Sequence, residues 1–140
     1  MLNRKGLDHF ELTGKIIGCC FEVLNELGNG FLETVYKNAL SISLQQIGFQ
    51  VLLEQSFDVI FRDQIIGKYI ADLIVENLVI IEVKSCNNLL PEHQAQLINY
   101  LKVSGIRIGL LVNFGHQKME YRRLSHPAEH IDEEIPFVLS

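Results

Sequence analysis

The chain has 140 residues and a formal net charge of −5, with 48% hydrophobic and 21% charged residues. This size and composition predict one globular domain, residues 1–140, and argue against a disordered, collagenous or coiled-coil chain. No uncharged apolar run approaches the roughly 18–20 residues that a membrane span needs. The N-terminus reaches Asp8 and Glu11 without the apolar stretch of a signal peptide, so we expect a cytoplasmic protein.

The first third of the chain has the apolar spacing of two helices. Residues 8–27 repeat apolar side chains every three or four positions, and residues 31–47 continue such a pattern after a glycine-rich break. The expected boundaries are Gly28 as the end of the first helix, Asn29 or Gly30 as N-cap of the second and Gly48 as its stop. The cysteines form no CxxC or disulfide pattern, so we expect Cys19 and Cys20 to serve helix packing.

The apolar period then changes from that of a helix to that of a strand. The expected later elements are strands at 57–61, 69–75 and 78–84, a helix at 91–104, strands at 107–114 and 118–124, and a tail or docking strand at 125–140. The order is therefore αα-βββ-α-ββ. A crossover helix before the fourth strand allows parallel pairing, which predicts an α/β fold with a mixed sheet of about four to five strands and helices on both faces.

Three charged residues occur in strands that otherwise have the composition of buried strands. Asp72 lies in the second strand, and Glu82 and Lys84 share one face at the end of the third because side chains alternate. One interpretation is a structural pair, Glu82–Lys84 or Asp72–Lys84. The other is a metal site, in which the carboxylates hold Mg²⁺ and the lysine orients or stabilises an attacking hydroxide.

The connection between these two strands decides whether the acids can meet. A two-residue turn at Glu76-Asn77 would place Asp72 and Glu82 on opposite faces of the sheet. An odd loop or a bulge is therefore required, and Asn77 is the expected place for it because asparagine tolerates positive φ.

Four segments together resemble a known enzyme family. Asp72 followed by Glu82-Val83-Lys84 resembles the D…(D/E)xK core of the PD-(D/E)xK nuclease superfamily, with Ala71 in place of the usual proline. The run from Gly30 through Glu33 to Tyr36 resembles the GxxExxY motif of small members, and Gln96 with Tyr100 resembles the QxxxY motif of the RecB-like branch. The resemblance covers residues 8–124 and implies a restriction-endonuclease-like core.

The resemblance also implies roles for individual residues. The implied metal ligands are Asp72, Glu82, Glu33 and the Val83 carbonyl, and the implied further catalytic residues are Lys84, Gln96 and Tyr100. Taken alone, Glu33 and Tyr36 would be a surface acid and a semi-buried tyrosine beside a core-facing Phe31. Gln96, Tyr100 and His93 share one helix face, which could be solvated surface or could face the acids. His93 is expected to be exposed, with contact to a metal or a leaving group as the alternative.

The leading hypothesis is a phosphodiesterase that cleaves DNA with Mg²⁺ or Mn²⁺. The net charge opposes charge-driven binding to nucleic acid, so such contacts must be local or metal-assisted. The candidates for a local basic patch are Lys68, Lys84, Lys102, Arg107, Lys118, Arg122 and Arg123. The alternatives are a catalytically idle nuclease-like module that binds nucleic acid or a protein partner, and a hydrolase of small phosphate esters. The small size of the domain also suggests a homodimer.

Overall fold

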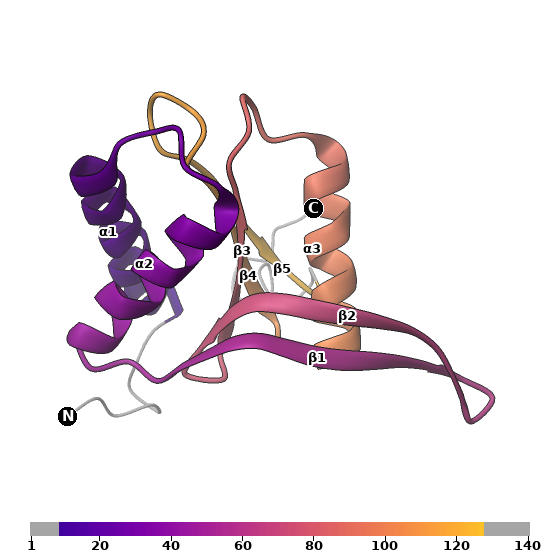
Figure 1. The fold of residues 1–140 in the computed structure, drawn as a ribbon. Helices are drawn as coiled ribbons and strands as arrows, with labels where there is room; N and C mark the ends of the chain where they lie inside the picture. Colours follow the sequence, from indigo (N-terminus) through magenta and orange to yellow (C-terminus); the bar gives the residue numbers. More distant parts are fainter. Residues whose placement is uncertain (1–8, 128–140) are drawn as a thin grey trace, which may run out of the picture.

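The structure, a computed structural model, describes residues 9–127. Its elements are α1 (His9–Leu27), α2 (Glu33–Gln46), β1 (Val51–Phe61), β2 (Gln64–Val75), β3 (Val79–Lys84), α3 (Pro91–Ser104), β4 (Ile108–Asn113) and β5 (Glu120–Ser125) (Figure 1). The predicted element order is confirmed. The N-terminal segment up to Asp8 and the tail beyond residue 127 lie outside the described residues. No helix within 9–127 is long and apolar enough to cross a membrane.

The five strands form one sheet in the order β1-β2-β3-β4-β5. Every neighbouring pair is antiparallel except β3 and β4, which run parallel. Helix α3 makes the crossover between these two parallel strands, as a parallel connection requires. The predicted mixed sheet is confirmed.

The helices cover the two faces of the sheet (Figure 1). Helices α1 and α2 pack on the face that carries Leu73, Ile81 and Val83, and Cys19 and Cys20 lie buried in that cluster as predicted. Helix α3 packs on the opposite face, against Ile74 and Ile80. Successive residues of β3 therefore point to opposite layers, which places Glu82 and Lys84 on the α3 face.

The entry into α2 differs from the prediction. The helix begins at Glu33, with Leu32 at the N-cap position, rather than after a cap at Asn29 or Gly30. The Asn29 amide instead donates hydrogen bonds to the carbonyls of Phe114 (2.7 Å) and His116 (2.9 Å). Phe31, expected to face the core, precedes the helix and is 46% exposed.

The β1–β2 hairpin is longer than predicted, because β1 begins at Val51. Only Leu73 to Val75 of β2 pair with β3. The remainder of the hairpin leaves β3 and runs beneath α3 (Figure 1), where Phe57 and Tyr69 pack on the α3 cluster. Strands β2 and β3 therefore separate at Asp72.

Candidate functional site

The loop between β2 and β3 has the odd length that the parity argument requires. Val75 pairs with Val79, so three residues connect the strands, and Glu76 and Asn77 both have a φ of 56°. The ladder runs on to the pair Leu73 and Ile81. Asp72 and Glu82, one step beyond that pair, therefore lie across from one another.

The carboxylates of Asp72 and Glu82 each accept a hydrogen bond from a backbone N–H of the other's strand. The backbone N–H of Asp72 donates to Oε2 of Glu82 (3.0 Å), and the backbone N–H of Val83 donates to Oδ2 of Asp72 (2.9 Å). Where β2 and β3 separate, the two carboxylates thus replace the backbone carbonyls of a regular ladder. No further backbone N–H of residues 9–127 donates to either carboxylate, and the two carboxyl groups lie close enough to share a hydrogen bond when Glu82 is protonated.

The surroundings of Asp72 and Glu82 disfavour a negative charge on both carboxylates. Glu82 is only 5% exposed. Burial, and then the neighbouring Asp72, raise the pKa of Glu82 to about 8, while Lys84 acts in the opposite direction. The carboxyl of Glu82 is therefore protonated over much of the neutral range unless a cation compensates.

Lys84 ends β3 and is half-buried on the same face as Glu82. Its backbone carbonyl accepts a hydrogen bond from Phe114 N–H (2.8 Å), which ties it to the end of β4. Within residues 9–127 the ammonium forms no ion pair with either acid. The structure thus gives no support to the Glu82–Lys84 or Asp72–Lys84 pair.

Helix α3 directs part of its polar face at the acids. Tyr100 is buried, and burial, then Glu82 and Asp72, raise its pKa to about 12. Gln96 lies one turn earlier and is exposed. His93 is half-buried rather than exposed, and its Nδ1 accepts the N–H of Leu90 (3.0 Å) at the start of the helix.

Glu33 and Tyr36 differ in burial and in their contacts. Tyr36 is fully buried, and its hydroxyl donates to the Gly28 carbonyl (2.5 Å) and accepts the N–H of Phe31 (3.2 Å). Glu33 is exposed and lines a pocket with Ser85. No group of three or more His, Cys, Asp or Glu side chains able to hold a metal occurs in the described part of the chain, so Glu33 does not complete such a group.

A buried asparagine at the end of β4, which the sequence analysis missed, fixes the loop after Lys84. Asn113 is fully buried, and its Oδ1 accepts the N–H groups of Cys86 (3.0 Å) and Gly115 (2.9 Å). Its amide group donates to the Cys86 carbonyl (2.9 Å) and to Glu120 Oε1 (3.0 Å). Glu120 Oε1 also accepts Leu89 N–H (3.0 Å). No local sequence pattern indicates these contacts, because Asn113 and Cys86 are 27 residues apart in the chain.

The candidate basic residues are partly engaged elsewhere. Lys68 lies 3.9 Å from Asp58, and Arg122 lies 3.7 Å from Glu120. The guanidinium of Arg123 lies over the ring of Phe10. The remaining candidates, apart from Lys84, are spread over three elements. Lys102 is on α3, Arg107 in the α3–β4 loop and Lys118 in the β4–β5 loop.

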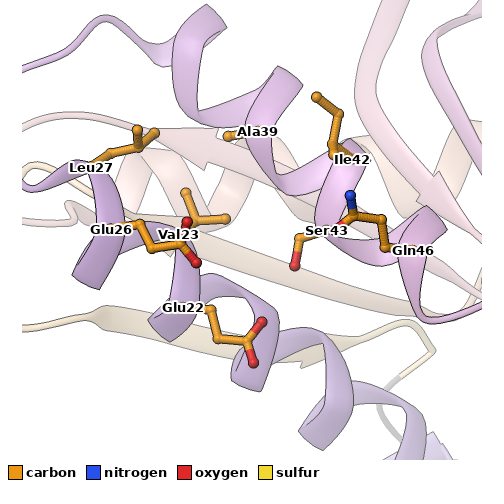
Figure 2. Close-up of a pocket in the computed structure, with 8 residues that line it drawn as sticks. All are labelled: Glu22, Val23, Glu26, Leu27, Ala39, Ile42, Ser43 and Gln46. Carbon is orange, nitrogen blue, oxygen red and sulfur yellow. The ribbon is translucent and has the colours of Figure 1, made fainter.

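Two pockets differ in their relation to these residues. A groove of about 280 Å³ lies between α1 and α2. Figure 2 shows Glu22 and Glu26 on one side of it and Ser43 and Gln46 on the other. None of the predicted site residues lines it. A second, open pocket of about 380 Å³ lies where the start of α2 meets the chain after β3, and Phe31, Leu32, Glu33, Thr34 and Ser85 line it.

Comparisons with known proteins bear on this arrangement. The crystal structure of SSO0001 matches with a TM-score of 0.55 and 22% identity over 68% of this chain, a likeness of fold alone. The chain spans 50% of the length of that protein. No curated protein matches the sequence. The family model described as "PD-(D/E)XK nuclease superfamily" matches residues 10–124, which contain the sheet, α3 and the acid pair. The chain therefore belongs to the PD-(D/E)XK nuclease superfamily.

Proposed function

We propose that the protein is a Mg²⁺-dependent phosphodiesterase that cleaves DNA, of the RecB-like, GxxExxY type. The observation that carries this proposal is the pairing of Asp72 and Glu82 across the gap between β2 and β3. Two acids facing each other in a mostly buried position gain nothing structurally from their mutual repulsion. Such an arrangement is expected of a site that receives a cation.

The donors suit a hard divalent cation. Each carboxylate has one oxygen that accepts no backbone N–H from the described residues, and carboxylate and carbonyl oxygens are the ligands that Mg²⁺ and Mn²⁺ prefer. We assign Asp72, Glu82 and the Val83 carbonyl as the ligands. The ion would supply Lewis-acid activation of water and charge stabilisation at the phosphate. Glu33 is not among these ligands, because the structure gathers no third acid at the pair.

The remaining residues act on the substrate and the attacking water. The Lys84 ammonium, which has no ion-pair partner among the described residues, orients the water and stabilises the charge that develops on the phosphate. Tyr100 faces the acids and keeps its proton, since its pKa is about 12, so its hydroxyl can donate to a phosphate oxygen. Gln96, one turn away and exposed, can reach the same phosphate.

The test is cleavage of circular and single-stranded DNA with Mg²⁺ or Mn²⁺, against an EDTA control. We expect metal-dependent cleavage by the wild type and none by Asp72→Asn or Lys84→Ala. Glu26→Gln, in the α1–α2 groove, and Lys15→Ala, exposed on α1, are matched controls that should cleave normally. No cleavage by the wild type, together with DNA binding, would favour the catalytically idle binding module. Turnover of a chromogenic phosphodiester without competition by DNA would favour a small phosphate ester.

A further inference from the structure

The pocket at the start of α2 contains an aromatic side chain that is both exposed and fixed. Phe31 is 46% exposed, yet both of its backbone polar groups are hydrogen-bonded. Its N–H donates to the Tyr36 hydroxyl (3.2 Å), and its carbonyl accepts the Ser85 hydroxyl (2.9 Å). The Phe31 ring also meets the Tyr36 ring edge to face, with 6.0 Å between centroids. The ring is therefore held in place with a large part of its surface open to solvent.

The other groups that line this pocket suit a nucleobase better than a phosphate. The side chains of Glu33 and Thr34 are exposed and have no hydrogen-bond partner among the described residues, and Ser85 adds a hydroxyl. A carboxylate repels a phosphate, but it accepts hydrogen bonds from the amino and imino groups on the edge of a base. No lysine or arginine lines the pocket.

The pocket is adjacent to the proposed site along the chain, with the pocket on the α2 side of the end of β3 and the acid pair on the α3 face. Ser85 directly follows Lys84, and it lies three residues beyond Glu82, about 10 Å along an extended strand. About three stacked nucleotides at roughly 3.4 Å each span that distance. A strand whose phosphate meets the acid pair can therefore bring a base to Phe31 if it passes over the end of β3, within about three nucleotides.

The charges of the chain favour recognition of bases by stacking over recognition of phosphates by charge. The net charge is −5, and Lys37, Lys68 and Arg122 are in ion pairs with acids of the same chain. Contacts to phosphates therefore supply less of the binding energy than in a basic nuclease. Stacking of bases on aromatic rings is the other main source of affinity for single strands.

We propose that Phe31 is a stacking platform for an unpaired base, so that the substrate of the proposed nuclease is single-stranded or locally unpaired DNA. This inference rests on the proposed function for its location, but base binding is measurable without cleavage. An internal paired base has both faces covered by its neighbours in a duplex, so away from the duplex ends only an unpaired base can stack on Phe31.

The chain has no tryptophan, so Phe31→Trp introduces a single fluorescent reporter at this position. The measurement is titration of Phe31→Trp with oligo(dT), with a blunt duplex of equal length and with thymidine monophosphate, in an Asp72→Asn background that prevents cleavage. Phe21→Trp is the matched control, because Phe21 is 44% exposed on α1. We expect oligo(dT) to quench the indole of Phe31→Trp, with little quenching by the duplex and none in Phe21→Trp.

Affinity for oligo(dT) gives a second readout, measured with labelled oligonucleotide in the same background. Phe31→Ala and Phe31→Leu should weaken binding by about 5- to 150-fold, the factor for loss of 1–3 kcal/mol of stacking. Phe31→Tyr and Phe21→Ala should bind as the parent does. Equal quenching in both tryptophan variants, unchanged affinity in Phe31→Ala, preference for the duplex, or no binding of oligo(dT) would overturn the inference. Quenching without wild-type cleavage would instead overturn only the nuclease function.

Discussion

The ring of Tyr36, from α2, stacks on the ring of Phe114, at the end of β4, with centroids 4.6 Å apart and planes within 6°. The Tyr36 hydroxyl meanwhile binds the backbone at Gly28 and Phe31. One buried side chain therefore joins the α1–α2 loop to the end of β4, the strand beside β3 of the proposed site. Tyr36, in the segment that resembles the GxxExxY motif, thus has a structural role in this chain.

Tyr36→Phe should keep the ring stack but leave the Gly28 carbonyl and the Phe31 N–H without their partner. We expect a loss of about 1–3 kcal/mol in the free energy of unfolding, or a melting temperature lower by roughly 3–10 °C. Tyr121→Phe is the control, since Tyr121 is 42% exposed on β5. Equal melting temperatures for Tyr36→Phe and the wild type would contradict this role.

The stability of the metal-free protein should fall as the pH rises. The pKa of Glu82 is raised from 4.5 to about 8 in the folded chain, so folding favours the protonated carboxyl. This contribution is complete below pH 4.5 and is lost as the pH rises through about 8. Each pKa unit corresponds to about 1.4 kcal/mol.

Urea denaturation in EDTA at pH 5 and pH 8.5 measures this effect. Glu82→Gln keeps an amide oxygen to accept Asp72 N–H and does not titrate, so its stability should decline less over that range. If both proteins show the same pH dependence, Glu82 does not have a raised pKa in the folded state.

Asn113 should hold the loop after β3 in a fixed conformation. Asn113→Ala removes all four hydrogen bonds, and Asn113→Asp keeps the acceptor but places a second carboxylate beside Glu120. We expect a loss of at least about 2 kcal/mol for the alanine variant. The Cys86 thiol should label faster with iodoacetamide, by about tenfold for each 1.4 kcal/mol of local stability lost. Cys19 and Cys20 are buried and serve as internal references. Unchanged labelling of Cys86 would argue against this role.

Glu33→Gln tests whether Glu33 belongs only to the pocket or also to the metal site. Because Glu33 lines the pocket and belongs to no group of three acids, the variant should keep the full increase in melting temperature that Mg²⁺ gives to the wild type. Loss of that increase would show that Glu33 is a metal ligand in solution, as the family resemblance implies.

Local patterns in the sequence predicted the order of the elements, because each helix and strand has its own apolar period. The side-chain period of two also predicted the odd loop at Asn77 that sets Asp72 opposite Glu82. The exposure of Phe31 and the burial of Tyr36 were not predictable in this way, since a helical repeat does not reveal where the helix begins. The network around Asn113 joins segments far apart in the chain, and no local pattern records such contacts.

The most direct test of the account is a melting curve of the wild type and Asp72→Asn, each in EDTA and in excess Mg²⁺. Asparagine can still accept the Val83 N–H through its amide oxygen, so the substitution removes charge while keeping this hydrogen bond. Above pH 8, where Glu82 is ionised in the metal-free wild type, we expect Asp72→Asn to be at least as stable as the wild type in EDTA, because the repulsion with Glu82 is gone. Mg²⁺ should raise the melting temperature of the wild type alone, with about 2.7 kcal/mol of stabilisation at a hundredfold excess over Kd. A clear loss of stability of Asp72→Asn in EDTA, with no effect of Mg²⁺ on the wild type, would contradict the proposed metal site.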